Sequence, residues 1–153
     1  MSNALEVVMA YANAFEETYA DDDWSRLAPY FAEDAVYEVV GGPLACRLEG
    51  REAIFAGLKK SLDTLDRRCS DRSIKLTDGP NVEYTPAGGT VSMGWHASYQ
   101  YRDAPREGFP GRSVATVNDG VITALRDEYD DAEMETFIAW MAQYGEGLSG
   151  SYV

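Results

Sequence analysis

Apolar residues recur at helical spacing in three stretches of the chain. Between Leu5 and Tyr19 they stand three or four residues apart, which is the stripe of an amphipathic helix. Similar stripes run through residues 50–65 and 131–144, so each of these stretches is predicted to form a helix. A shorter helix is expected over residues 24–31, where Pro29 should end or kink it early.

Residues typical of β-strands fill most of the remaining chain. A first run covers residues 34–40 and stops at the sequence GGP. The later runs are separated by glycine, proline, asparagine and aspartate, which favour turns. These runs cover residues 73–76, 81–84, 90–101, 112–117 and 120–129.

The order of these elements predicts the fold class. Two helices come first, followed by one strand, another helix, a series of hairpin-linked strands and a last helix. We therefore expect an α+β fold in which helices pack on one face of a curved, mostly antiparallel sheet. Helices on the concave face of such a sheet enclose a cone-shaped pocket, where a small molecule would bind. The domain is expected over residues 1–145, and residues 146–153 are expected to form a loose C-terminal tail.

The predicted strand over residues 90–101 has two different faces. One face carries large apolar and aromatic residues, among them Trp95 and Tyr99, whereas the other carries small polar residues with His96 at its middle. We predict that the polar face looks into the pocket and that the aromatic face forms a homodimer interface. The opposite assignment remains open, because aromatic side chains pack equally well against helices.

Charge limits the partners of this chain. Its net charge of −13 arises from 26 acidic and 13 basic residues. Nucleic acids and anionic membrane surfaces bind proteins through clustered cations, so neither is an expected partner. No apolar run approaches the roughly 20 residues that span a bilayer, and the N-terminus lacks the basic start of a signal peptide. A cytoplasmic protein is therefore predicted.

Metal and cofactor chemistry is not indicated by the composition. The two cysteines, Cys46 and Cys69, and the single histidine, His96, do not supply the ligands of a usual zinc site. The apolar stripe of residues 134–141 is interpreted as core rather than as a cofactor site. No cofactor and no metal are predicted.

One carboxylate stands on the apolar face of a predicted strand. In residues 120–129 the alternation places Asp127 in phase with Val121, Leu125 and Tyr129, so its side chain is expected to face the core. A core-facing carboxylate is tolerable where it lines a solvent-accessible cavity and has a partner. Because such placements concentrate at active sites, Asp127 is a candidate functional residue.

Three segments of the chain resemble the nuclear transport factor 2-like superfamily. They are YFAEDAVYEV at residues 30–39, LEGREAI at residues 48–54 and VNDGVITALRDEYD at residues 117–130, and they occur in the order found in the family. The chain looks closest to the branch that holds limonene-epoxide hydrolase, SnoaL-like polyketide cyclases and ketosteroid isomerases. This resemblance implies the same α+β fold with a cone-shaped pocket.

The resemblance to limonene-epoxide hydrolase implies roles for individual residues. Asp127 matches the aspartate of that enzyme's last strand, and Tyr37 matches a tyrosine of its first strand that helps to hold water. His96 takes the place of its second aspartate, while Gly94 and Val39 replace an arginine and an asparagine. Because only part of the set is kept, the resemblance does not imply epoxide hydrolysis by the same mechanism.

The candidate residues predict acid–base chemistry on a small apolar molecule, such as isomerisation, cyclisation or hydration. SnoaL-like cyclases resemble this chain in combining an aspartate base with a nearby histidine. Asp127 is assigned as the base, His96 as the acid or orienting partner, and Tyr37 as the group that positions substrate or water.

Structural interpretations of the same residues stay open. Backbone amides or a tyrosine hydroxyl can satisfy a buried Asp127, His96 can be a hydrogen-bonded wall residue, and Tyr37 can be core packing. The chain would then be a non-catalytic module for small-molecule binding or dimerisation.

Overall fold

The first helix, α1 (Ala4–Asp21), begins at a reciprocal cap in the computed structural model, which describes residues 3–153. The Asn3 side chain accepts a hydrogen bond from the Glu6 amide at 2.9 Å, and the Glu6 carboxylate accepts one from the Asn3 amide at 3.3 Å. The predicted apolar stripe of α1 faces the sheet, and Val8 on it is buried.

The other predicted helices are confirmed. They are η1 (Trp24–Tyr30), a 3₁₀ helix that contains Pro29, α2 (Arg51–Thr64) and α3 (Asp131–Tyr144). A short 3₁₀ helix that was not predicted, η2 (Asp66–Arg68), follows α2. Among residues 3–153, no helix has both the length and the apolar character that crossing a membrane requires.

Most of the acidic groups between residues 127 and 131 have a structural role. Asp130 caps α3 by accepting hydrogen bonds from the amides of Ala132 and Glu133, and Asp131 accepts one from the Gly42 amide at 2.7 Å. Glu128 forms an ion pair with Arg126 at 2.8 Å. Asp127 is left as the carboxylate of this run that capping and surface pairing do not explain.

Six strands form one sheet in the order β2-β1-β6-β5-β4-β3. The β1 and β6 strands are parallel, and every other neighbouring pair is antiparallel, so the sheet is mostly antiparallel, as predicted. The strands are β1 (Phe31–Val40), β2 (Cys46–Glu49), β3 (Asp71–Thr85), β4 (Gly88–Gln100), β5 (Glu107–Asn118) and β6 (Val121–Glu128).

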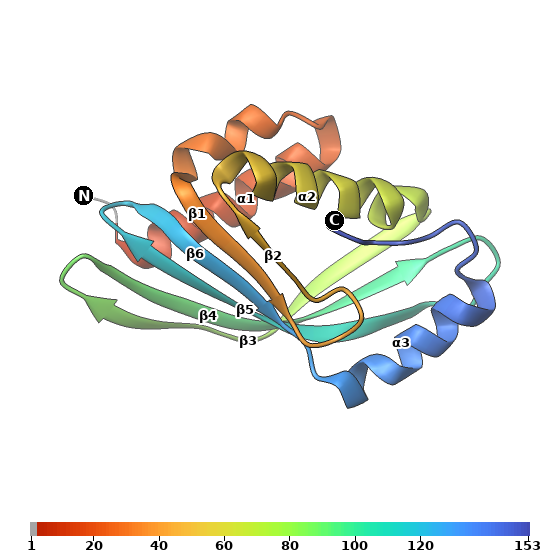
Figure 1. Cartoon of the computed structure of the whole chain (residues 1–153). Coiled ribbons are helices and arrows are strands. Elements are labelled where there is room, and N and C mark those ends of the chain that lie inside the picture. Colours follow the sequence, from red (N-terminus) through yellow and green to blue (C-terminus); the bar gives the residue numbers. More distant parts are fainter. Residues whose placement is uncertain (1–2) are drawn as a thin grey trace.

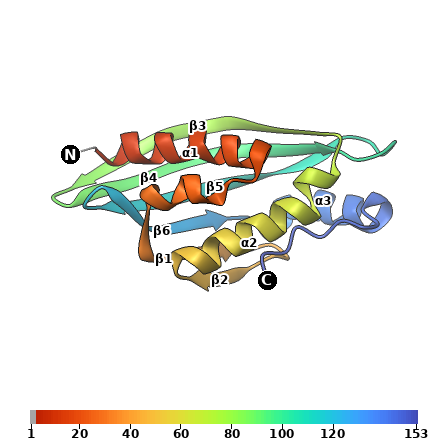
Figure 2. The ribbon, with the colours of Figure 1, turned by 90° about the horizontal axis from the view of Figure 1, so that it is seen from above.

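The sheet curls, and the helices lie on its concave side (Figure 1). Seen from above, α1, η1 and α2 run over the sheet, and α3 lies towards one end of it (Figure 2). The β5 strand extends past the end of β6, because Arg112 pairs with Glu128 and residues 107–111 pair only with β4. Since α3 follows β6 directly, it packs on this uncovered part of β5 and closes that end of the hollow.

The strand pattern between residues 73 and 84 differs from the prediction of two strands joined by a turn. A single strand, β3, runs through the whole region and stays paired with β4 on both sides of Gly79. Gly79 adopts a left-handed φ of 82°, which shifts the register without ending the pairing. The glycine and proline therefore mark a bulge rather than a turn.

The two faces of β4 are reversed relative to the prediction. The aromatic face looks onto the helices, where Val91, Ala97 and Tyr99 are buried, and His96 on the polar face is exposed outside. Burying the larger apolar area against α1 and α3 is more favourable than leaving it to a partner subunit. The aromatic face is therefore not a dimer interface, and a homodimer formed through the sheet would have to use the polar outer face.

The C-terminal segment is attached to the domain rather than loose. It runs from α3 back to α2 (Figure 1), and the Ser149 amide donates a hydrogen bond to the Thr64 carbonyl at 2.9 Å. The prediction of a free tail fails because a segment of glycine and serine residues can be held by backbone hydrogen bonds that leave no periodic signal.

Candidate functional site

The hollow between the sheet and the helices contains a cavity of about 480 Å³. Its wall is mainly apolar and aromatic, with side chains from the sheet, the helices and the C-terminal segment. The aromatic members include Phe15, Trp95, Tyr99, Phe109, Tyr129 and Phe137. A cavity of this size and lining suits a compact, largely apolar small molecule.

Asp127 is the charged group of β6 that lines this cavity. Its Oδ2 accepts a hydrogen bond from the Tyr37 hydroxyl at 2.5 Å, and its Oδ1 accepts one from the Ser113 hydroxyl at 2.6 Å. Asp127 pairs with Val39 on β1 and with Ser113 on β5, so both neighbouring strands contribute to its surroundings. Asp127 is largely buried but not fully so, and it lines the cavity.

A second hydrogen bond extends the Asp127 site across the sheet to β4. The Trp95 indole Nε1 donates to the Ser113 hydroxyl at 2.9 Å, so Ser113 accepts from Trp95 and donates to Asp127. Trp95 lies across Gly111 on β5, where a Cβ atom would stand 2.5 Å from the indole ring. The Gly111 position thus allows the indole to reach Ser113, and the chain of donors orients the Ser113 proton towards the carboxylate.

Burial sets the protonation of the groups in the Asp127 site. It raises the pKa of Asp127 above the ordinary aspartate value, although the hydrogen bonds from Ser113 and Tyr37 act in the opposite direction. Burial and the adjacent Asp127 carboxylate raise the pKa of Tyr37 well above its ordinary value. Tyr37 therefore remains a neutral hydrogen-bond donor to Asp127 at neutral pH.

The Tyr37 hydroxyl holds the Asp127 carboxylate through its hydrogen bond. The Tyr37 side chain is 0% exposed, whereas Asp127 is not fully buried. Tyr37 also lines the cavity, and its hydroxyl is already committed to the Asp127 carboxylate. This position fits a residue that orients Asp127, and the predicted role in holding substrate or water stays a prediction.

Replacing Tyr37 by phenylalanine is expected to raise the pKa of Asp127 further, because the carboxylate loses a donor that favours its ionised form. The free energy of unfolding at neutral pH should fall by about 1.5–3 kcal/mol, the usual worth of a hydrogen bond to a charged group. Carboxyl ¹³C NMR titration and chemical denaturation measure the two effects. Tyr84→Phe, at an exposed site, is the control; equal titration curves in both variants would contradict the assigned contact.

The stability of the protein should carry a signature of Asp127 as pH changes. A carboxyl group whose pKa is raised by folding stabilises the folded state below its unfolded pKa of about 3.9, and this stability is lost as pH rises through the folded pKa. As pH increases from about 4, the unfolding free energy of the wild type should therefore fall relative to that of Asp127→Asn. Denaturation of both proteins across that range tests this, and a difference independent of pH would refute it.

A pair of charged side chains borders the cavity near the start of β3. Arg72 and Asp66 form an ion pair at 2.8 Å, and both side chains are only 8% exposed. Arg72 also pairs with Glu16 of α1 at 3.0 Å, and its guanidinium lies 4.2 Å from the Tyr19 ring centre. These contacts tie α1, η2 and β3 together. Within residues 3–153, no cluster of three histidine, cysteine or acidic side chains is arranged to hold a metal ion.

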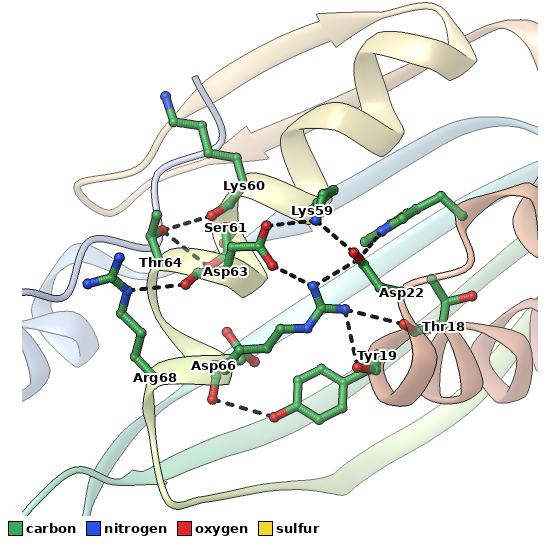
Figure 3. A network of polar contacts seen from close by, with 12 residues as sticks. Thr18, Tyr19, Asp22, Lys59, Lys60, Ser61, Asp63, Thr64, Asp66 and Arg68 are labelled. Carbon is green, nitrogen blue, oxygen red and sulfur yellow. Dashed lines mark hydrogen bonds and ion pairs between the residues drawn. The ribbon is translucent and has the colours of Figure 1, made fainter.

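A surface network joins the end of α1 to α2 beside this ion pair (Figure 3). Lys59 bridges Asp22 at 2.8 Å and Asp63 at 2.9 Å, and Arg67 contacts the same two carboxylates. The Arg67 guanidinium also donates to the carbonyl of Tyr19 at 3.2 Å. The network thus links the end of α1 to α2 and η2.

The sequence matches the family model described as the SnoaL-like domain over residues 12–125, which is most of the chain. The chain belongs to the SnoaL-like family. The matched region includes Tyr37 and Ser113 and ends two residues before Asp127. Among curated proteins, none matches the sequence of this SnoaL-like chain.

Solved structures share the fold of this SnoaL-like chain at low sequence identity. A Bacillus subtilis protein provisionally named an isomerase is 18% identical, with a TM-score of 0.63 over 91% of this chain and 97% of that one. A Burkholderia pseudomallei protein of unknown function, described as nuclear transport factor 2-like, is 15% identical, with a TM-score of 0.61 over 90% and 98%.

A third similar structure carries a name from polyketide chemistry. This Xanthomonas campestris protein, provisionally named a polyketide cyclase, is 22% identical, with a TM-score of 0.54 over 91% of this chain and 98% of that one. At these identities the likenesses establish the nuclear transport factor 2-like fold of the SnoaL-like chain.

The pairing of His96 with Asp127 predicted from the sequence is wrong. Successive side chains of a strand point to opposite faces, and Trp95 and Ala97 point into the cavity, so His96 points out of it. His96 pairs with Lys75 and Pro110 and is exposed. In the SnoaL-like chain, the β4 residue that reaches the Asp127 site is Trp95, acting through Ser113.

Sequence reasoning missed Ser113 and Trp95, which form the hydrogen-bond chain to Asp127, and Tyr152 of the C-terminal segment, which lines the cavity. Ser113 carried a usable signal, because it is in phase with Ala115 and Val117, just as Asp127 is in phase with Leu125. Trp95 was identified only as part of an aromatic face. No periodicity marks Tyr152, since its segment has no regular secondary structure.

Proposed function

We propose that this protein is an enzyme that transfers protons on a compact, largely apolar molecule bound in the cavity, with Asp127 as the proton-accepting group. The observation that carries the proposal is a carboxylate that lines an aromatic cavity and is oriented by two hydroxyl donors. A general base works best when its pKa lies near the working pH, and burial moves the pKa of Asp127 in that direction.

The chemistry follows from the groups around Asp127. The carboxylate accepts a proton from a C–H bond next to a carbonyl group, and the electron pair of that bond becomes an enolate. The same carboxyl group then returns the proton. If the proton returns to another carbon, the reaction is an isomerisation. In a cyclisation, the enolate carbon first attacks a second carbonyl of the same molecule, which becomes an alkoxide. The proton then returns to that alkoxide.

Tyr37 and Ser113 act as positioning residues in this scheme. Their hydrogen bonds hold both carboxylate oxygens, so that the remaining lone pairs are directed to the cavity. Holding the base in one orientation lowers the entropy lost on reaching the transition state. The name of the Xanthomonas protein, which refers to polyketide cyclisation, is consistent with a ketone-bearing substrate.

Small-molecule binding without chemistry is the second candidate. The exposure of His96 favours it, because Asp127 then lacks the titratable imidazole partner that a two-residue proton relay would use. In that case the Asp127 carboxylate would accept a hydrogen bond from a hydroxyl group of the ligand.

Deuterium exchange separates the two candidates without knowledge of the natural substrate. The protein is incubated in deuterium oxide with compact ketones such as 2-acetylnaphthalene and α-tetralone, and deuterium uptake next to the carbonyl is followed by mass spectrometry. Catalysis predicts uptake faster than in buffer or with heat-denatured protein. Binding of these ketones without accelerated uptake would reject the enzyme and support the binding module.

A further inference from the structure

Residues 146–153 follow a fixed path from α3 across the end of α2. The Tyr101 hydroxyl donates to the Glu146 carbonyl at 2.6 Å, and the Arg68 guanidinium donates to the Gly147 carbonyl at 2.9 Å. Two α2 residues hold Gly150: the Ser61 hydroxyl donates to its carbonyl at 2.7 Å, and its amide donates to the Thr64 hydroxyl at 2.9 Å. Ser61 and Thr64 lie in the last turn of α2, and Arg68 lies at the end of η2, which follows it (Figure 3).

A glycine inside α2 lets the segment lie close to the helix. A Cβ atom at Gly57 would stand 3.1 Å from the Tyr152 carbonyl oxygen and 2.4 Å from a Leu48 methyl group. Glycine in a helix interior costs about 1 kcal/mol relative to alanine, so this position is used for close approach rather than for helix stability. Both elements thus contribute to the contact: α2 through Gly57, and the C-terminal segment through its hydrogen-bonded backbone.

The segment ends by placing Tyr152 in the wall of the cavity next to the Asp127 site. The Tyr152 ring packs edge-on against the Tyr37 ring, with 5.6 Å between ring centres. Unlike Tyr37, Tyr152 is only half-buried, so a bound molecule can reach it. Burial and the adjacent Asp127 carboxylate raise the pKa of Tyr152 to about 12, and the phenol therefore keeps its proton at neutral pH.

Two neighbours of Tyr152, Tyr37 and Ser61, donate their hydroxyl protons to other acceptors. The Tyr37 hydroxyl donates to Asp127, and the Ser61 hydroxyl donates to the Gly150 carbonyl. Tyr11, Tyr129 and Tyr152 are all phenols of the cavity wall, and among them Tyr152 is the one whose ring packs against Tyr37, the hydrogen-bond donor to Asp127.

We propose that Tyr152 donates a hydrogen bond to the carbonyl oxygen of the bound molecule, so that the C-terminal segment completes the binding site. This inference rests on the proposed function, because a base and a donor on adjacent walls suit a ketone whose neighbouring C–H bond faces Asp127. An enolate formed at Asp127 carries its charge on that oxygen, and a donor placed there stabilises it. The ligand class is an aromatic or polycyclic ketone.

Two probes that differ in one oxygen atom test the proposal. The full-length protein and its Tyr152→Phe variant are titrated with 2-acetylnaphthalene, which has the carbonyl group, and with 2-ethylnaphthalene, which lacks it. Loss of one neutral hydrogen bond should weaken binding of the ketone about fivefold and leave binding of the hydrocarbon unchanged. Deuterium uptake by the ketone should also slow in the variant at saturating probe.

Thr64→Val serves as a comparison variant, because Thr64 anchors Gly150 but does not line the cavity. Loosening the segment should weaken binding of both probes to the same extent, whereas Tyr152→Phe should weaken binding of the ketone alone. If Tyr152→Phe weakens binding of both probes equally, or of neither, the proposed hydrogen bond is wrong. Failure of the wild type to bind the ketone would overturn the ligand class. Selective weakening without any deuterium uptake would uphold the Tyr152 contact and reject the enzyme instead.

Discussion

Replacing Asp127 by asparagine is expected to lower the rate of deuterium exchange into a bound ketone by about 10²–10⁴-fold, the range that a positioned general base contributes. Asparagine has nearly the same shape, and its carbonyl oxygen can accept a hydrogen bond from Tyr37 or Ser113 as Asp127 does. Binding of 2-acetylnaphthalene should therefore remain close to that of the wild type. The two measurements together distinguish loss of chemistry from loss of the site.

The matched control for this variant is Asp103→Asn, which makes the same chemical change in the exposed turn after β4. It should leave both exchange and binding unaltered. A wild-type rate of exchange in Asp127→Asn would remove the carboxylate from the mechanism. Equal losses of binding and exchange would instead assign Asp127 to ligand recognition.

Replacing Arg72 by methionine is expected to lower the free energy of unfolding by about 3–5 kcal/mol, since removal of one partner of a buried ion pair leaves the other charge uncompensated. Both side chains of the Arg72–Asp66 pair are 8% exposed, so solvent cannot replace the lost guanidinium. Burial already raises the pKa of Asp66, and Arg72 opposes that rise. Because protonation relieves the unpaired carboxylate, the loss should shrink as pH falls.

Chemical denaturation of three variants tests the account of the buried pair. The double variant Asp66→Asn with Arg72→Met should recover much of the loss, because no charge is left buried without a partner. Arg106→Met removes a cation from an exposed pair with Asp71, and its effect should stay within about 1 kcal/mol. Similar effects of Arg72→Met and Arg106→Met would show that burial does not govern this pair.

The fold could be predicted well because its signals are local. The stripes of α1 and α3 and the alternation of β6 each arise within a few residues, and the order of elements then restricts how they can pack. The bulge at Gly79 was mistaken for a turn because a glycine–proline pair is compatible with both. The distinction depends on whether β4 continues to pair on the far side, which is a contact distant in sequence.

The candidate site could be predicted only in part. Asp127 was identified because a charge in phase with apolar residues is visible within its own strand. His96 was assigned wrongly because the alternation of β4 defines two faces without saying which one meets the helices. Tyr37 was identified from the resemblance; its hydrogen bond to Asp127 adds an orienting contact, and its role in holding substrate or water stays a prediction.

The amino-acid sequence alone was sufficient for the α+β class, the three long helices, the strands β1, β4, β5 and β6, and the inward direction of Asp127, because the repeat of apolar positions along each element records them. The choice of face for β4, the Trp95–Ser113–Asp127 contacts and the docking of Tyr152 beside Asp127 emerged only from the folded chain. Each of these joins elements far apart in sequence, and curvature and register set such distances; no local pattern encodes them.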